Sequence, residues 1–194
     1  MLVLASQSPR RAELLRAAGF EFTVRTVDVD ESIERQESPE GYVQRLAEKK
    51  AMAVAIQPHE MVLGADTIVA LGDEILGKPR DDEHAREMLE RLSGRRHEVY
   101  TGVCLRTAER IRTRFSCTGV WFDEMEAPEI EAYVRSGEPR DKAGAYAIQG
   151  LAAKYIPRID GSYSNVVGLP VDLVHRMMKE ERSAPGRQEE YRLG

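Results

Sequence analysis

Ser6-Gln-Ser-Pro-Arg-Arg11 brings two hydroxyls, a proline and two arginines together near the start of the chain. The segment follows a short apolar run and precedes a helical pattern. Pro9 suits a first helical position, Ser8 is a good N-cap, and a helix start favours an anion. Arg10 and Arg11 add forked donors that match phosphate oxygens. The segment is therefore suited to bind a phosphate, the alternative being a capped helix with two solvated arginines.

A carboxylate within an apolar strand pattern is the second chemical feature. Gly64-Ala-Asp-Thr67 lies inside the apolar run Met61 to Leu71. A charge at Asp66 is costly unless it meets a cation, a metal or a hydrogen-bond network, and ionised groups in apolar strands cluster at active sites. We therefore favour a functional role over a buried carboxylate that accepts from loop N–H groups. Gly64 would let a ligand approach the backbone closely.

The third feature is Gly77-Lys-Pro-Arg-Asp81, which puts Lys78 and Arg80 between a strand and a capped helix start. This arrangement suits phosphate, although turn lysines are mostly solvated. Gly72 to Lys78 also spells G-x-x-x-x-G-K, most of a Walker A loop. We reject a P-loop because Pro79 stands where Ser or Thr is needed and the residues between the glycines are strand-like.

Three further polar groups are weaker signals. Lys50 falls on the apolar repeat of a helix expected over 39–56, where it either extends its ammonium to solvent or pairs with an anion. Gln149, directly before Gly150, can present an amide that matches the N3–H and O4 of uracil or thymine, or can bind backbone. The acidic run Asp28 to Glu31 could supply a magnesium ligand or form a solvated loop.

Composition limits the class of protein. The 194 residues fit one domain, or one domain with two lobes, and 42% hydrophobic with 31% charged residues is typical of a soluble globular protein. A net charge of −5 does not indicate general binding to nucleic acid or membranes. Cys104 and Cys117 have neither zinc nor C-x-x-C spacing, and no apolar stretch reaches the length of a signal peptide or membrane span. A reduced cytoplasmic protein is the simplest expectation.

Strand and helix patterns alternate along the chain and must position these groups. We expect strands over 2–5, 22–27, 61–71, 74–76, 97–106, 111–122 and 152–159, and helices over 9–18, 39–56, 82–92, 128–134 and 170–181. Residues 137–150 are predicted to be a glycine-rich loop, and residues 183–194 a disordered polar tail. The pattern predicts an α/β fold with a mixed sheet.

Taken together, the motifs resemble those of the Maf family of nucleoside triphosphate pyrophosphatases. They are S-x-S-P-R-R at 6–11, V-D-E at 29–31, L-A-x-x-K at 46–50, G-A-D-T at 64–67, G-K-P-R-D at 77–81, D-K-A-G-A-Y-x-I-Q-G at 141–150 and G-S-Y-x-x-V-x-G-L-P at 161–170. The resemblance implies an elongated, twisted mixed sheet flanked by helices, with two lobes around a central cleft, in one domain over 1–182. It further implies a cytoplasmic homodimer that hydrolyses a nucleoside triphosphate between its α- and β-phosphates with Mg²⁺ or Mn²⁺.

Within that family the chain is similar to the branch acting on dTTP and UTP. In this chain Arg10 directly follows Ser-Pro, Thr67 follows the aspartate, and Gln149 precedes a glycine. In the 7-methyl-GTP branch a Trp is inserted after Ser-Pro, and a Glu replaces the Gln. The resemblance implies that Asp66 accepts a proton from the attacking water and, with Glu31, helps position the divalent cation. It assigns further catalytic roles to Lys50, Lys78 and Glu31, and substrate contacts to Ser6, Ser8, Arg10, Arg11, Thr67, Arg80 and Gln149.

The predicted function is therefore housekeeping of the nucleotide pool by a dTTP/UTP pyrophosphatase, with modified pyrimidine triphosphates as further candidate substrates. The alternative is a nucleotide-sensing regulatory protein of cell-division arrest without significant turnover. A nucleic-acid-binding module is disfavoured by the acidic net charge and the lack of a basic stripe with aromatic residues.

Overall fold

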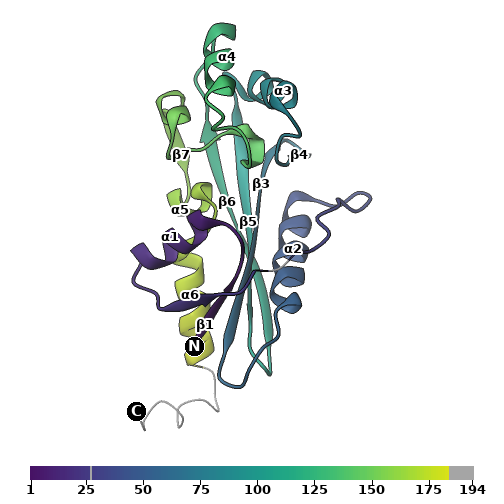
Figure 1. The fold of residues 1–194 in the computed structure, drawn as a ribbon, viewed down its shortest axis with the longest axis vertical. Helices are drawn as coiled ribbons and strands as arrows, with labels where there is room; N and C mark the ends of the chain where they lie inside the picture. The colour runs from purple at the N-terminus through teal and green to yellow at the C-terminus, as the bar shows by residue number, and fades with distance from the viewer. Residues whose placement is uncertain (27, 184–194) are drawn as a thin grey trace.

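One long, twisted sheet forms the axis of the protein in a computed structural model that describes residues 1–26 and 28–183 (Figure 1). Its strands are β1 (Leu2–Ala5), β2 (Phe22–Val24), β3 (Met61–Leu71), β4 (Glu74–Leu76), β5 (Arg96–Arg106), β6 (Ile111–Trp121) and β7 (Arg158–Asp160). The strand order is β2-β1-β3-β5-β6-β7, and β4 pairs with β3 outside this path. β1 is parallel to β2 and β3, and the other pairs are antiparallel. The predicted mixed α/β sheet is confirmed.

Helices cover both faces of the sheet and its upper end. They are α1 (Pro9–Ala17), α2 (Pro39–Ala53), α3 (Asp82–Leu92), α4 (Ala127–Arg135), α5 (Tyr163–Val167) and α6 (Val171–Arg182), with 3₁₀ turns over Ala143–Ala145 and Leu151–Tyr155. In Figure 1, α1 and α6 lie on one side of the lower sheet, α2 lies on the other, and α3 and α4 lie at the top. The expected elongated shape with two lobes is therefore present.

Strand β1 is buried on both faces, as its unbroken apolar sequence predicts. Leu2 and Leu4 belong to the cluster that contains side chains of α1 and α6, whereas Val3 and Ala5 pack with side chains of α2. The upper lobe has a separate core, built from α3, α4 and the ends of β3, β5 and β6. The boundary between the upper and lower cores is at the middle of the sheet, and the space between the two lobes lies there.

Two glycines let α2 lie against the sheet at backbone distance. A Cβ added at Gly64 would be 2.1 Å from the Ala47 carbonyl oxygen, and one at Gly102 would be 2.0 Å from the Val43 carbonyl oxygen. We expected the space beside Gly64 to admit a ligand, and that prediction is wrong because helix backbone fills it. The close approach instead fixes how far α2 side chains reach over β3.

The segment expected to be a strand over 152–159 is mostly not one. Residues Leu151–Tyr155 form a 3₁₀ turn, in which Ala153 N donates to Gly150 O at 3.1 Å, and β7 covers only Arg158–Asp160. Helix α5 was not predicted from the sequence; Ser162 caps it by accepting from the Asn165 N–H.

The remaining sequence predictions on elements are close. β2 ends at Val24, short of the expected 27, and residue 27 lies outside the described residues. So does the predicted tail, apart from Ser183 at the end of α6. No helix within residues 1–26 and 28–183 is both long and apolar enough to cross a membrane.

Candidate active site

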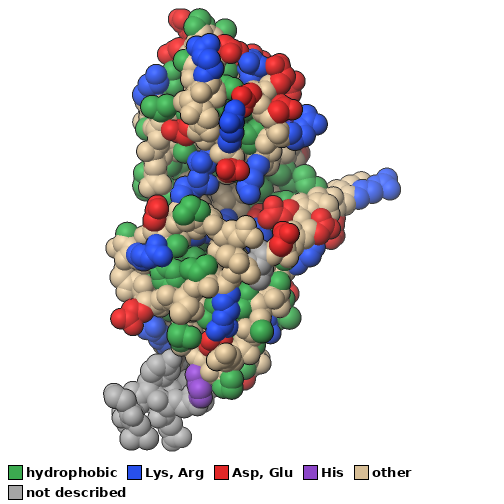
Figure 2. Space-filling view, viewed as in Figure 1, with side chains coloured by type: hydrophobic (Ala, Val, Ile, Leu, Met, Phe, Trp, Pro, Cys, Tyr) green, Lys and Arg blue, Asp and Glu red, His purple; other side chains and the backbone are tan. Residues whose placement is uncertain are grey.

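A cleft of about 980 Å³ lies at the middle of the sheet, between the lobes. Figure 2 shows Lys and Arg side chains gathered around the hollow there, with acidic side chains beside them. The end of β1, the start of α1, α2, β3 and the loop over residues 141–149 all contribute to its lining. The structure brings most of the predicted site residues into this cleft, namely Ser6, Ser8, Arg10, Arg11, Glu31, Lys50, Asp66, Thr67, Lys78 and Gln149.

Lys50 joins the two carboxylates of the site. Its Nζ lies 2.6 Å from Asp66 Oδ1 and 2.6 Å from Glu31 Oε1. Asp66 is 6% exposed on β3 and Lys50 is 8% exposed on α2. Because α2 lies so close to the sheet, an inward-facing lysine on this helix meets β3 rather than solvent. Of the two sequence interpretations of Lys50, pairing with an anion is the one that the structure bears out.

The pKa values of the two carboxylates move in opposite directions. Burial raises the pKa of Asp66, although the charges of Lys50 and Arg11 oppose it. Burial acts in the same direction on Glu31, but its hydrogen bond and charge interaction with Lys50 outweigh that effect and lower its pKa. Paired carboxylates with divided pKa values are typical of sites in which one group exchanges protons while the other stays ionised. Asp66 is the group suited to accept a proton.

Arg11 is a buried structural centre of the site. Its Nε donates to Gly168 O at 2.9 Å, its Nη1 to Ala65 O at 2.8 Å and to Ser6 Oγ at 3.2 Å, and its Nη2 to Thr67 Oγ1 at 3.0 Å. Burial lowers its pKa, with Asp66 opposing. These four bonds join Ser6, which directly follows β1, and the middle of β3 to the turn between α5 and α6. The contact of Arg11 with substrate stays a prediction, since most of its donors already bind protein oxygens.

The start of α1 differs from the predicted capping pattern. Ser8 is the N-cap residue, but within the described part of the chain its hydroxyl makes no capping bond. Its backbone N–H instead donates to Ser6 Oγ at 3.2 Å. Arg10 is half-buried at the cleft, and burial lowers its pKa while Asp141 opposes. Ser6 therefore organises the segment between β1 and α1, and Arg10 is placed to meet a ligand in the cleft.

Lys78 and Arg80 separate in the structure although they are two residues apart. Lys78 is exposed and lines the cleft. Arg80 lies outside the lining, where its backbone N–H and Nε both face His84 Nδ1 at 3.2 Å. The structure thus does not place Arg80 in the candidate site, because the side chain follows the start of α3 instead.

The loop over residues 141–149 supplies the opposite side of the cleft. Gln149 is exposed there, and Lys142 and Tyr146 line the cleft beside it. Burial lowers the pKa of Lys142, and the nearby charge of Arg10 adds to this effect. We did not single out Lys142 from the sequence. Its place in the same glycine-rich segment as Gln149 was a signal that could have identified it.

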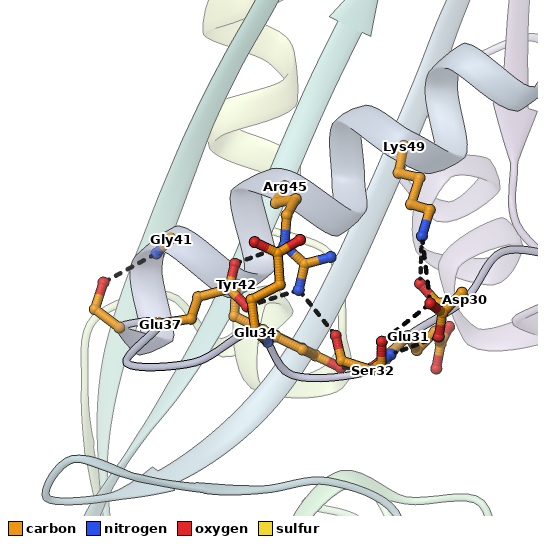
Figure 3. A network of polar contacts seen from close by, with 10 residues as sticks. Asp30, Glu31, Ser32, Glu34, Glu37, Gly41, Tyr42, Arg45 and Lys49 are labelled. Atoms are coloured by element: carbon orange, nitrogen blue, oxygen red, sulfur yellow. Dashed lines mark hydrogen bonds and ion pairs between the residues drawn. The ribbon is translucent and has the colours of Figure 1, made fainter.

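Side chains of α2 hold the acidic loop (residues 28–37), which carries Glu31 (Figure 3). Tyr42 Oη donates to the Glu31 carbonyl oxygen at 2.7 Å, and Lys49 Nζ donates to the Asp30 carbonyl oxygen at 2.8 Å. Glu31 itself is about half exposed. Its position therefore depends on contacts made by its own backbone and by its neighbour.

Arg45 makes the most extensive contact with the acidic loop. Its Nε and Nη2 each donate to one oxygen of Glu37 at 2.6 Å, and Nη2 also donates to the Ser32 carbonyl oxygen at 3.0 Å. The guanidinium lies over the Tyr42 ring at 5.5 Å (Figure 3). A bidentate contact of this kind fixes both distance and orientation.

Asp66 and Glu31 fit the requirements of a magnesium or manganese ion. Mg²⁺ is commonly bound by one or two carboxylates together with substrate phosphates and water. The two carboxylates converge on one point, now marked by the Lys50 ammonium. Among residues 1–26 and 28–183 no group of three or more His, Cys, Asp or Glu could hold a metal ion without other ligands. Phosphate oxygens and water would therefore complete the coordination of a cation held by these two carboxylates.

The fold and cleft define an α/β protein whose charged site lies between two lobes of one long sheet. Solved structures share this fold: a HAM1 protein from Coxiella burnetii matches with a TM-score of 0.53 and 17% identity over 94% of this chain and 98% of that one. The Ham1 protein of Staphylococcus aureus matches with a TM-score of 0.50 and 12% identity over 93% and 98%.

The chain belongs to the Maf-like protein family, whose model matches residues 1–181. A dTTP/UTP pyrophosphatase of Anaeromyxobacter dehalogenans is 53% identical over 174 residues, 88% of this chain and 88% of that protein. A dTTP/UTP pyrophosphatase of Pseudoalteromonas atlantica is 49% identical over 176 residues, 88% of this chain and 92% of that protein.

Proposed function

We propose that this Maf-like protein hydrolyses dTTP and UTP to the monophosphate and pyrophosphate, as housekeeping of the nucleotide pool. The observation that carries the proposal is the buried Asp66, whose pKa is raised and whose carboxylate meets Lys50 in a cleft rich in basic side chains. The names of the relatives support the choice of substrates. Modified pyrimidine triphosphates would fit the same cleft chemistry.

In the proposed mechanism, the triphosphate lies against Arg10, Lys78 and the start of α1. Asp66 takes a proton from the attacking water as the water oxygen bonds to the α-phosphorus. The bond from that phosphorus to the bridging oxygen breaks, and pyrophosphate leaves with the bond's electron pair. Phosphoryl transfer depends mostly on positioning and electrostatics, so the cations lower the barrier by balancing charge on the leaving group.

We propose that Asp66 and Glu31 hold the divalent cation, Mg²⁺ or Mn²⁺, together with phosphate oxygens. When bound, the cation would neutralise charge on the triphosphate. Lys50 keeps the two carboxylates together and limits their mutual repulsion. Because the pKa of Glu31 is lowered, its carboxylate stays ionised to lower pH and can remain a ligand as the pH falls.

Gln149 is the proposed reader of the base. Its amide offers one acceptor and two donors, which complement the N3–H and O4 of uracil and thymine. Cytosine exchanges donor and acceptor at this edge, so the amide could meet it only by rotating. A site built on such hydrogen bonds discriminates strongly, since the wrong base leaves polar groups unpaired. A glutamate at this position would instead favour guanine, which presents two donors.

The test is pyrophosphate release from dTTP, UTP, CTP, GTP and 7-methyl-GTP with Mg²⁺ or Mn²⁺. We expect selective turnover of dTTP and UTP, its loss in Asp66→Asn with the fold retained, and a much weaker UTP turnover in Gln149→Glu. Full activity of Asp66→Asn would remove the proton-acceptor assignment. Tight binding of nucleotides without turnover across the whole panel would replace the enzyme by the nucleotide-sensing regulatory protein.

We further propose that the protein works as a homodimer in the cytoplasm, without nucleic-acid or membrane partners. The similarity to the family supports the dimer, and the net charge of −5 argues against polyanion binding. Light scattering during size-exclusion chromatography tests the assembly, and a mass near 21.8 kDa would contradict the dimer.

A further inference from the structure

The short turn that carries Gln149 is held at both ends by one pair of side chains. Ala147 N donates to Tyr133 Oη at 3.2 Å, and Leu151 N donates to Glu138 Oε2 at 3.0 Å. Tyr133 Oη in turn donates to Glu138 Oε1 at 2.8 Å. The two side chains therefore form a continuous link from one side of the turn to the other, with Gln149 between the two anchored N–H groups.

The Tyr133 end of this link is immobilised by the core of the upper lobe. Tyr133 lies on α4, is 3% exposed and packs in the same cluster as Ile130 and Val134. Burial and the hydrogen bond to Glu138 raise the pKa of its hydroxyl, so it remains protonated and keeps its donor role. α4 thus sets the position of the oxygen to which Ala147 N–H is bound.

Gly150 shows how closely Glu138 lies against the turn. A Cβ at this position would be 2.3 Å from Glu138 Oε1 and 2.3 Å from Oε2. The φ angle of Gly150 is −114°, so glycine is required here for space rather than for backbone conformation. The carboxylate therefore occupies the place of a side chain on the residue that directly follows Gln149.

The turn also has a hydrogen bond of its own, from Gly150 N to Ala147 O at 3.1 Å. Removing the outer anchors would leave this bond in place, so the turn would remain a turn but could move relative to the cleft. The phosphate-facing groups lie on other elements, with Arg10 on α1 and Asp66 on β3. A shift of the turn should therefore change base recognition more than phosphate chemistry.

We propose that Tyr133 and Glu138 are positioning residues for base selection. They fix the depth and orientation at which the Gln149 amide enters the cleft, and so set the preference for uracil and thymine over cytosine. Neither side chain is among those that line the cleft, so both act through the backbone of the turn. The inference rests on the proposed function, in which Gln149 reads the base.

The experiment compares kcat/KM for UTP with kcat/KM for CTP in purified variants. Tyr133→Phe and Glu138→Ala each remove two hydrogen bonds of this link, and each is expected to lower the UTP-to-CTP ratio by at least about fivefold, the effect of losing one typical hydrogen bond. Glu138→Gln, which keeps one acceptor, should lie between wild type and Glu138→Ala. Gly150→Ala should reproduce the Glu138→Ala ratio, because the new Cβ displaces the carboxylate.

Tyr155→Phe is the matched control. Tyr155 is buried in the same core, and its hydroxyl donates to Glu129 Oε1 at 3.1 Å, whereas the side-chain bonds to Ala147 N and Leu151 N come from Tyr133 and Glu138. Its removal should leave the UTP-to-CTP ratio at the wild-type value. Thermal unfolding of every variant separates a loss of fold from a loss of selectivity.

The outcomes separate this inference from the proposed function. An unchanged ratio in Tyr133→Phe and Glu138→Ala, with a reduced ratio in Gln149→Ala, would overturn the positioning role and leave base reading by Gln149 intact. An equal fall in kcat/KM for UTP and CTP would also overturn it, since the pair would then be structural only. An unchanged ratio in Gln149→Ala would overturn both.

Discussion

Lys50 is the residue on which the charges of the candidate site converge, since its ammonium contacts both Asp66 and Glu31. Asp66 holds its proton more tightly in the folded protein than in the unfolded chain, because burial raises its pKa. For such a carboxyl, the free energy of unfolding falls as the pH rises from the pKa of the group in the unfolded chain to its pKa in the folded protein. At neutral pH this cost is present, so Asp66→Asn should not lower the melting temperature, although activity is lost.

The same charges predict how the rate responds to acid. The kcat/KM for UTP should fall as pH is lowered through the pKa of Asp66, which lies above its ordinary value of 3.8. The groups facing Asp66 are Lys50 and Arg11, which lower this pKa, and Glu31, which raises it. Lys50→Gln removes a stabilising cation, so the acidic limb should move to higher pH.

Wild type and Lys50→Gln are assayed with the same nucleotide, so that the titration of the nucleotide affects both rates equally. The measurement is a pH–rate profile from neutral pH down to the lowest pH at which both proteins remain folded. An acidic limb at the same pH in wild type and Lys50→Gln would contradict the assignment of this limb to Asp66.

Among the elements, the contact of α2 with the sheet sets the distance between Lys50 and Asp66. Gly64→Ala would place a Cβ 2.1 Å from a helix carbonyl oxygen, so α2 must shift or the strand must bend. We expect a loss of about 1–3 kcal/mol in the free energy of unfolding, as for other overpacked sites. Urea unfolding measures it.

Gly77→Ala is the control for this change. Within 4 Å of a Cβ at Gly77 nothing lies in the part of the chain that the structure describes. Its free energy of unfolding should remain near that of the wild type. Equal stability of the two variants would contradict the tight packing of α2 at Gly64.

The acidic loop is a second element whose placement can be tested. Arg45→Gln removes the bidentate bond to Glu37 and the bond to Ser32 O, so Glu31 should be less well held beside Lys50. We expect faster amide hydrogen exchange over residues 28–37 and a severalfold higher Mn²⁺ concentration for half-maximal activity. Arg91→Gln, which breaks the Arg91–Glu74 ion pair at the surface, is the matched control. Exchange rates unchanged in Arg45→Gln would show that other contacts hold the loop.

Regular elements could be predicted well from the sequence, whereas close approaches and short turns could not. β3 and β4 have the predicted bounds because β3 is a long apolar run, the Gly72-Asp73 turn separates it from β4, and Gly77 follows β4. The 3₁₀ turn Leu151–Tyr155 was mistaken for a strand because short apolar runs carry no clear period. The position of Arg80 depends on its partner His84, which a one-dimensional pattern cannot show.

At the scale of the whole molecule, each lobe has its own core, and the upper core contains a buried histidine. His97 is 0% exposed, shares a 2.8 Å hydrogen bond with Tyr146 Oη and packs edge-on against Phe122. Burial lowers its pKa from 6.5 to about 4. Between these two pKa values, His97 binds a proton in the unfolded chain but not in the folded protein. The free energy of unfolding therefore falls as the pH decreases from 6.5 toward 4.

The shift corresponds to a stability loss of up to about 3 kcal/mol between these pH values. Urea unfolding at a series of pH values should therefore give a steeper acid dependence for wild type than for His97→Gln, in which this titration is absent. His175→Gln changes an exposed histidine and serves as the control. Parallel pH dependences for wild type and His97→Gln would rule out His97 as a source of acid sensitivity.

The bond from Arg11 to Gly168 O joins residues 157 positions apart in the chain. During synthesis on the ribosome, the segment with the two arginines emerges first, and its last backbone acceptor is translated 157 residues later. A nascent chain that stops before residue 168 lacks this part of the scaffold. The network around Arg11 is thus completed only after residue 168 has been added, so the order of synthesis separates the making of the arginines from the making of the scaffold that holds them.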